Sequence, residues 1–207
     1  MQGDRLLITQ QSYNNARLIN DKLTNQSIIL IGGNSGTQKS ESADCLQEIL
    51  FKNNKQSIVL SLDDFYNTLP FIRNINRRKL GIQSVGLSEI DFEELKRICD
   101  DFKNKKPIRF RRVHKYATIV EHIVLDTEDI NCLIIEGLYS NYLRKDNYGD
   151  LSVYLEGNPS QTLEFRKKRG KEDETDKFRL EVVDKEFRVI SQLKRYADLV
   201  IEYKGDN

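Results

Sequence analysis

A glycine-rich segment followed by lysine and serine is the strongest chemical signal in this sequence. Residues 33–40 read Gly-Asn-Ser-Gly-Thr-Gln-Lys-Ser, close to the pattern G-x-x-x-x-G-K-[ST]. In such a loop, backbone N–H groups point at phosphate oxygens, the lysine adds a positive charge, and the serine hydroxyl reaches Mg²⁺. The pattern therefore predicts a nucleotide-phosphate site made of Gly33, Asn34, Ser35, Gly36, Thr37, Gln38, Lys39 and Ser40.

One position departs from this pattern. Gln38 stands where the pattern has a glycine. A side chain at this position is expected either to crowd the phosphates or to require a strained backbone. A degenerate loop that binds weakly, and an ordinary glycine-rich turn at the start of a helix, therefore stay open as alternatives.

The elements around the loop are those that a phosphate site requires. An apolar run at 27–31 precedes the loop and predicts a buried strand, and a helical pattern follows it. Strands are also expected at 57–62, 132–135, 151–155 and 199–201, an edge strand at 118–125, and helices at 10–24, 88–104, 159–170 and 175–195. Short apolar strands alternating with helices predict a parallel sheet covered on both faces. Ligands of such sheets bind at the carboxyl ends of the strands, where Lys39, Asp63 and Glu136 are expected.

Composition and charge narrow the class of protein. The 207 residues are 38% hydrophobic and 31% charged, with a net charge of +1, which is typical of a globular protein. This balance argues against a general affinity for nucleic acid or acidic membranes. The three cysteines have no metal-binding spacing, and no apolar segment resembles a signal or a membrane span. We therefore expect a cytoplasmic protein with neither a membrane nor a nucleic-acid partner.

The order of the motifs resembles that of the uridine kinase and phosphoribulokinase family over roughly residues 27–203. After the phosphate loop, the matching pieces are Leu62-Asp63-Asp64-Phe65-Tyr66, Ile135-Glu136-Gly137-Leu138, the pair Arg166 and Arg169, and the ending from Lys194 to Ile201. The resemblance implies a three-layer α/β P-loop NTPase fold, similar to nucleoside and metabolite kinases, with a central parallel sheet and a helical lid.

The length and the resemblance predict a single kinase domain over residues 1–207. Within it, the core strands and the phosphate loop are expected at 27–62, an acceptor-binding region at about 63–126, and the lid at about 159–180. Family members often self-associate, so a homo-oligomer is also expected from the resemblance.

The resemblance further implies an enzyme, a phosphotransferase that moves the γ-phosphate of ATP to an alcohol group with the help of Mg²⁺. Asp63 would accept the proton of the attacking hydroxyl, and the two arginines would stabilise the charge that develops on the phosphate. The expected catalytic residues are Asp63, Lys39, Arg166 and Arg169, and the expected metal ligands are Ser40, Asp63 and Glu136.

The expected acceptor is a small molecule, and the segment from Pro107 to His114 bears on its charge. Uridine kinases have aromatic and acidic residues after a proline here, with a histidine that reads the base. In this chain His114 fits that histidine, but arginines replace the tyrosine and a second aromatic residue. Guanidinium groups suit carboxylates and phosphates, which favours a sugar phosphate or a hydroxy acid. The expected substrate-binding residues are Asp64, Tyr66, Arg109, Arg111, His114 and Glu136.

Several alternatives stay open. The arginines of 109–112 could be solvent-facing charge on an edge strand, and the cluster from Arg73 to Lys79 is ambiguous in the same way. A uridine or cytidine kinase is the main alternative function. A catalytically degenerate regulatory protein that still binds nucleotide is the next, and an RNA-binding protein fits least well because the basic segments lack interleaved aromatic residues.

Overall fold

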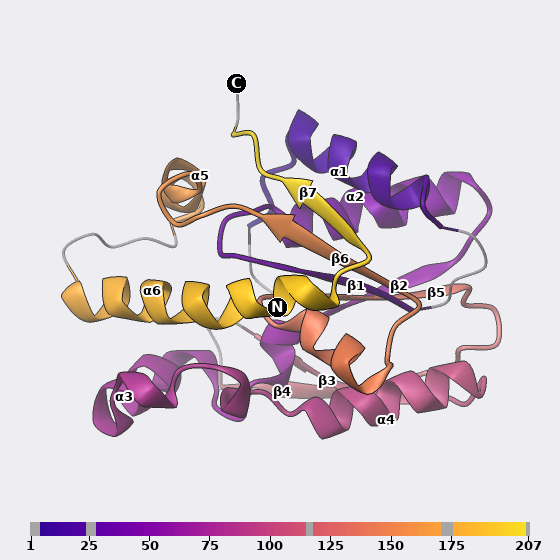
Figure 1. Ribbon diagram of the computed structural model, residues 1–207. Coiled ribbons are helices and arrows are strands. Elements are labelled where there is room, and N and C mark those ends of the chain that lie inside the picture. Colours follow the sequence, from indigo (N-terminus) through magenta and orange to yellow (C-terminus); the bar gives the residue numbers. More distant parts are fainter. Residues whose placement is uncertain (1–4, 24–27, 115–117, 171–175, 206–207) are drawn as a thin grey trace.

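A parallel sheet forms the centre of the molecule. The computed structural model describes residues 5–23, 28–114, 118–170 and 176–205, and Figure 1 shows their arrangement. Within these residues the sheet contains β1 (Ile28–Gly33), β2 (Ser57–Ser61), β5 (Cys132–Glu136), β6 (Leu151–Glu156) and β7 (Leu199–Glu202). Their order is β2-β5-β1-β6-β7, and every neighbouring pair is parallel. The apolar runs of the sequence thus predicted these strands correctly.

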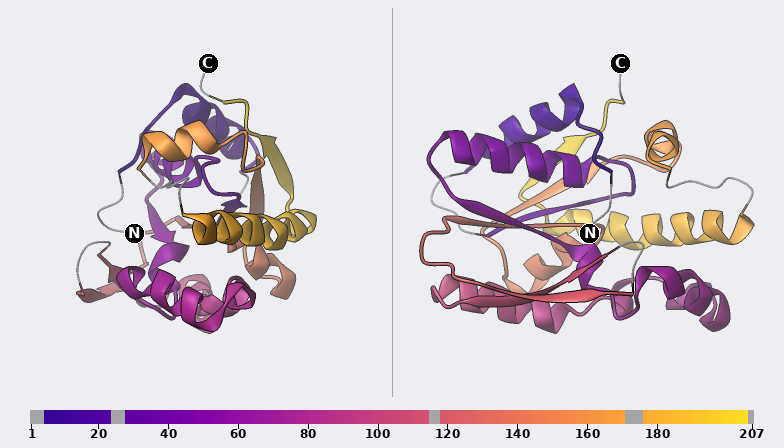
Figure 2. Two further views of the ribbon diagram at one scale, coloured as in Figure 1. Left: turned by 90° about the vertical axis from the view of Figure 1, so that its left-hand side faces the viewer. Right: turned by 180° about the vertical axis from the view of Figure 1, so that it is seen from behind.

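Helices cover both faces of the sheet, so the predicted three-layer α/β architecture is confirmed. On one face lie α1 (Gln10–Asn20) and α2 (Lys39–Lys52), packed on Ile29, Ile31 and Ile134. The opposite face carries α4 (Phe92–Lys103), the 3₁₀ turn Leu62–Phe65 and the 3₁₀ segment Ser140–Asp146. Figures 1 and 2 show these layers on either side of the strands. Because strand side chains alternate between faces, strands buried on both sides read as uninterrupted apolar runs.

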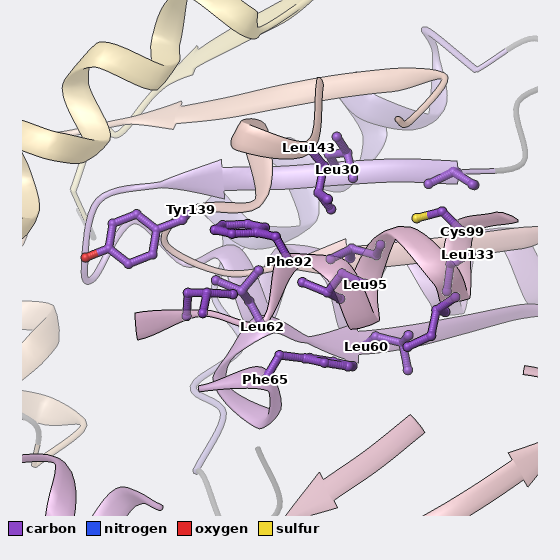
Figure 3. Close-up of a cluster of buried hydrophobic side chains, with 14 of the residues drawn as sticks. Leu30, Leu60, Leu62, Phe65, Phe92, Leu95, Cys99, Leu133, Tyr139 and Leu143 are labelled. Carbon is purple, nitrogen blue, oxygen red and sulfur yellow. The ribbon is translucent and has the colours of Figure 1, made fainter. Parts of the chain in front are cut away.

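The larger core lies on the α4 side, where Figure 3 shows its members. Leu30 and Leu133 of the strands share this cluster with Leu95 and Phe92 of α4, and Tyr139 lies at one end of the side chains drawn. All five side chains are buried. The core holds the carboxyl ends of β1 and β5 close to the turn that follows β2, which is where functional side chains are expected.

Three further helices lie toward the carboxyl ends of the strands. They are α3 (Pro70–Leu80), α5 (Leu163–Lys168) and α6 (Lys177–Ser191). Helix α3 was not predicted, because the most prominent feature of this segment in the sequence is its basic charge. Pro70 at its first turn is nevertheless a favourable start, since proline has no N–H to leave unsatisfied there. Helix α5 is shorter than the predicted helix at 159–170, and α6 begins where Asp176 accepts hydrogen bonds from Phe178 N and Arg179 N.

The basic segment after Pro107 forms the first strand of a separate hairpin. Strands β3 (Ile108–Val113) and β4 (Val120–Leu125) pair in antiparallel fashion, and β3 packs on α4. Ile108, Phe110 and Val113 are buried, whereas Arg109 is exposed. Within the part of the chain that the structure describes, no helix combines the length and the apolarity needed to cross a membrane.

Candidate active site

A cavity of about 310 Å³ lies at the carboxyl ends of β1, β2 and β5. The loop after β1 lines it with Lys39 and Ser40, the turn after β2 contributes Asp63, and β5 ends in the cavity at Glu136. Residues from three segments far apart in the sequence, each at the carboxyl end of a different strand, are therefore brought together, as is usual where parallel strands end.

The phosphate loop has the tight backbone that its glycines predict. Gly33 and Gly36 have φ angles of 136° and 82°, a region that residues with a Cβ rarely adopt. A Cβ on Gly33 would lie 2.2 Å from the carbonyl oxygen of Leu155, and one on Gly36 would lie 2.8 Å from Cγ of Arg166. Any larger residue at either position would displace the backbone of β6 or the arginine.

Gln38 takes a left-handed conformation, with φ 65° and ψ 36°. Its side chain is buried, and Oε1 accepts a hydrogen bond of 2.7 Å from Oγ1 of Thr9. Gln38 is absent from the residues that line the cavity, although its neighbours Gly36 and Lys39 are present. Of the two consequences expected for a side chain at this position, the strained backbone is therefore observed, and the side chain packs outside the cavity.

Lys39 is a buried cation at the base of the cavity. Its Nζ donates a hydrogen bond of 2.6 Å to the carbonyl oxygen of Asn34. Burial lowers the pKa of Lys39 to about 8, against the opposing influence of Glu136 and Asp63. The ammonium form is thus poorly solvated where it stands, and an anion in the cavity would stabilise it. A phosphate group fits that requirement.

Oxygen atoms suited to Mg²⁺ lie beside the lysine. Ser40 Oγ donates to Oε2 of Glu136 at 3.1 Å, and Asp63 lines the same cavity. No cluster of three or more His, Cys, Asp or Glu side chains that could hold a metal occurs among the described residues. Mg²⁺ commonly takes one or two carboxylates and completes its shell with phosphate oxygens and water, so this donor set fits a magnesium–nucleotide complex.

Two arginines enter the cavity from α5 and the residue that follows it. Arg166 is buried, and its Nη1 donates to Oγ1 of Thr162 at 2.6 Å and to the carbonyl oxygen of Pro159 at 2.9 Å. Arg169 lies 3.2 Å from Oε1 of Glu41 through Nη1. Both were predicted from the sequence, and both lie where they line the same space as Lys39.

Helices α3 and α6 add residues that the sequence did not single out as a site. Arg73 and Arg77 come from α3, and Arg179 and Glu186 come from α6. Their spacings of four and seven residues place each pair on one helix face, a signal that could have been found once these helices were recognised. The cavity is therefore more basic than its loop and carboxylates alone would make it.

The arginines of α3 differ in what they contact. Arg77 is paired with Glu89 at 2.7 Å and with Glu186 at 3.1 Å. The guanidinium of Arg73 stacks over the ring of Tyr66, 3.4 Å from its centroid. Nε and Nη2 of Arg73 are buried and have no hydrogen-bond partner in the described part of the chain. The charge of Arg77 is thus neutralised within the protein, whereas Arg73 has two N–H donor groups available for a ligand.

Four of the predicted substrate-binding residues lie outside the cavity lining. Asp64 accepts a hydrogen bond of 3.1 Å from Val113 N, and burial raises the pKa of its carboxyl group to about 6. Arg109 is exposed, Arg111 pairs with Glu94 of α4 at 3.1 Å, and Nε2 of His114 lies 3.5 Å from Glu121. Their roles in acceptor binding stay predictions, whereas Tyr66 and Glu136 do line the cavity.

Known proteins with similar sequences are kinases or contain one. The profile of the phosphoribulokinase / uridine kinase family matches residues 28–207. The chain is 26% identical over 194 residues to the bifunctional alpha-galactosidase/sucrose kinase AgaSK of Mediterraneibacter gnavus, a match covering 87% of this chain and 20% of that protein. It is 26% identical over 133 residues to a uridine kinase of Ureaplasma parvum serovar 3, covering 62% of this chain and 61% of that one. The chain thus spans less than two thirds of both curated relatives.

Solved structures with the same fold include two further proteins described as kinases. A protein of Silicibacter sp. TM1040 assigned as a fructose transport system kinase superposes with a TM-score of 0.64 at 17% identity, over 93% of this chain and 100% of that chain. D-glycerate 3-kinase of Cryptococcus neoformans var. grubii superposes with a TM-score of 0.53 at 12% identity, over 93% of both chains. At these identities the likeness establishes the fold and nothing finer.

Proposed function

Because the chain belongs to the phosphoribulokinase / uridine kinase family, we propose that it is a kinase that transfers the γ-phosphate of ATP to a hydroxyl group of a small metabolite. One observation carries the proposal. A single cavity contains the lysine and serine of the phosphate loop together with Asp63 and Glu136 from two other strand ends. Phosphoryl transfer depends on positioning, charge neutralisation and a carboxylate near the nucleophile, and these residues supply all three.

Each of these residues has a separate role in the proposed transfer. Lys39 and the loop N–H groups bind the phosphates, and Arg166 and Arg169 stabilise the charge on the transferring group. Asp63 accepts the proton of the acceptor hydroxyl as the new oxygen–phosphorus bond forms. The bond between the γ-phosphorus and the bridging oxygen breaks, and ADP leaves. Mg²⁺, held by Ser40, Asp63 and Glu136, would neutralise charge on the phosphate oxygens.

We further propose that the acceptor carries a negative charge, as a sugar phosphate or a hydroxy acid does. Support comes from Arg73. Its donor nitrogens Nε and Nη2 are buried and have no hydrogen-bond partner in the described part of the chain. A buried donor left unpaired is costly, and a carboxylate or phosphate would satisfy a guanidinium best. Arg73 lines the same cavity as Asp63, so an acceptor whose hydroxyl lies near Asp63 has Arg73 in the same cavity to bind its anionic group.

A screen of ATP consumption tests both parts of the proposal. The acceptors should come in matched pairs, such as a sugar and its phosphate or a polyol and its acid, with uridine and cytidine included because a curated relative is a uridine kinase. We expect Mg²⁺-dependent turnover that favours the charged member of a pair. Turnover of uridine or of neutral sugars alone would overturn the anionic acceptor. ATP binding without turnover of any acceptor would favour a regulatory protein, and absence of nucleotide binding would overturn the kinase.

A further inference from the structure

Residues 5–9, here called the strap, contact three separate parts of the nucleotide site. Thr9 Oγ1 donates to Oε1 of Gln38 in the phosphate loop at 2.7 Å. Leu7 N donates to Oε1 of Glu41 in the first turn of α2 at 3.4 Å. The carbonyl oxygen of Arg5 accepts from Nε of Arg169 at 3.2 Å. One short segment thus touches the loop, the helix that follows it, and an arginine that lines the cavity.

Of these three contacts, the hydrogen bond from Thr9 to Gln38 has the clearest physical role. A left-handed conformation is unfavourable for a residue with a Cβ relative to glycine, so Gln38 has a backbone conformation in the loop that glutamine itself does not favour. Its side chain is also buried, at 1% exposure, and a buried amide requires hydrogen-bond partners. The hydroxyl of Thr9 supplies one of them. The bond therefore helps to retain Gln38 in its strained conformation.

The strap is anchored by the helix that follows it. Thr9 is the N-cap of α1, accepting from Ser12 N while Ser12 Oγ accepts from Thr9 N at 2.9 Å. Ala16 and Ile19 of α1 are fully buried in the core that α1 shares with α2. The hydroxyl that reaches Gln38 therefore comes from a residue whose backbone is held by a helix cap and by packing.

Arg169 is held by the same segment. Its side chain is 7% exposed and pairs with Glu41, whose side chain is fully buried. The same carboxylate oxygen, Oε1, accepts from the strap at Leu7 N. Glu41 thus connects the strap to an arginine predicted to act on the transferring phosphate.

We propose that Thr9 is a positioning residue for the phosphate loop, and that its bond to Gln38 replaces the conformational freedom that a glycine gives other loops of this type. The strap then keeps the loop N–H groups and Lys39 in the arrangement that binds phosphate. The inference rests on the proposed function to the extent that the ligand of the loop is a nucleotide. Residues before α1 thereby support the nucleotide site, although residues 5–9 do not line the cavity.

A double-mutant cycle between Thr9 and Gln38 tests the inference. Thr9→Val removes the donor with little change in shape and leaves Gln38 Oε1 without it. We expect magnesium–ATP affinity, measured by calorimetry, to fall about fivefold, the equivalent of one typical hydrogen bond. In a Gln38→Gly background the same substitution should have no further effect, because the tie is already absent. In steady-state kinetics the KM for ATP should rise while the KM for the acceptor stays unchanged.

Two variants separate the effect of the Thr9–Gln38 hydrogen bond on ATP affinity from the effect of the helix cap at the start of α1. Thr9→Ser retains the hydroxyl and should keep full affinity. Ser12→Ala weakens the start of α1 without touching Gln38 and should also keep it. If Ser12→Ala weakens binding as much as Thr9→Val, helix α1 matters rather than the tie, and the inference is overturned. Thr9→Ala takes the place of Thr9→Val in the cycle if valine disturbs folding.

Amide hydrogen exchange in nucleotide-free protein gives a second measurement that needs no ligand. Thr9→Val should speed exchange across residues 34–40 about fivefold, as expected for a loop released by one hydrogen bond. Unchanged exchange together with unchanged ATP affinity would overturn the inference. A wild-type chain that fails to bind ATP would instead overturn the proposed kinase function, and exchange would still decide the role of the strap.

Discussion

Asp63 and Asp64 are neighbours in the chain, yet the turn after β2 sends them to different places. Asp63 lines the cavity beside Lys39 and Glu136. Asp64 turns away and accepts from the backbone of Val113 in the hairpin. At the scale of single residues, position along a 3₁₀ turn decides which carboxylate lines the cavity, where the proposed proton transfer would occur, and which one holds a neighbouring element.

Replacing Asp63 by asparagine removes the proposed base while keeping the size of the side chain. We expect the transfer rate to fall by at least about 100-fold, within the range attributed to general-base catalysis, while magnesium–ATP still binds. Single-turnover kinetics and calorimetry on the same preparation measure the two effects. A variant that retains wild-type turnover would show that another group accepts the proton.

Arg73→Gln tests whether this arginine recognises an anionic acceptor. Loss of a charge-assisted hydrogen bond costs about 1.5–3 kcal/mol, so the KM for a charged acceptor should rise about 10- to 100-fold. The KM for ATP should not change. Arg78→Gln is the matched control, because Arg78 lies on the same helix, pairs with Asp176, and does not line the cavity. Equal effects of the two substitutions would argue against a specific role for Arg73.

At the scale of elements, the site depends on how α3 and the hairpin are attached to the core. Helix α3 is tied by Arg77 to Glu89 and to Glu186 of α6. The hairpin is tied by Val113 N to Asp64 after β2. Each attachment includes a buried carboxyl group, Glu186 in the first and Asp64 in the second. Each can therefore be tested by measuring the free energy of unfolding.

The buried pair of Arg77 and Glu186 should be sensitive to loss of one partner. Both side chains are at most 5% exposed, and Glu186→Ala leaves part of the Arg77 charge uncompensated. We expect the free energy of unfolding to drop by about 3 kcal/mol, a typical cost of breaking a buried ion pair. Arg188→Ala, on the same helix, removes an exposed pair with Asp184 and should change stability by less than about 1 kcal/mol. Urea denaturation of both variants makes the comparison.

The carboxyl group of Asp64 should make the free energy of unfolding fall as pH rises through the weakly acidic range. Burial raises its pKa in the folded protein to about 6, above its value in the unfolded chain of about 3.9. The folded state therefore binds the proton more tightly, and its contribution to stability is lost as pH rises between about 4 and 6. The stability of wild type minus that of Asp64→Asn should fall across this window by on the order of 2–3 kcal/mol. A difference that stays constant with pH would contradict the raised pKa.

At the scale of the whole molecule, the cavity is lined by segments spread along most of the chain. The phosphate loop follows β1, Asp63 follows β2, Glu136 ends β5, and Arg166 lies in α5. Figure 2 shows α3, α5 and α6 gathered at the same end of the sheet. A ligand that binds several of these pieces at once should stabilise the fold as a unit.

Magnesium–ATP should raise the melting temperature. At about 100 times its Kd a ligand adds about 2.7 kcal/mol of stability, which for a chain of this size is a rise of about 5–10 °C. Lys39→Ala should abolish most of the shift, and chelation of Mg²⁺ should reduce it. A shift of equal size in the Lys39→Ala variant would show that nucleotide binds elsewhere.

The features that local sequence determines are the strands and the phosphate loop. An apolar run of five or six residues has to be buried on both faces, and glycines at positions 33 and 36 permit a backbone that other residues resist. Because strand ends in a parallel sheet share one edge, the convergence of Lys39, Asp63 and Glu136 also follows from the sequence. These are short-range patterns, and the structure has them where they were predicted.

Which basic cluster reaches the cavity depended on long-range packing. The arginines of β3 looked suited to an anion, but Arg111 pairs with Glu94 of α4, and it was Arg73 of the unpredicted helix α3 that lines the cavity. The partner of Gln38 is likewise Thr9, distant in sequence and brought near by the packing of α1 on α2. The sequence shows which residues are charged but not where their side chains point. That direction is set by how the helix or strand that carries them packs against the rest of the core.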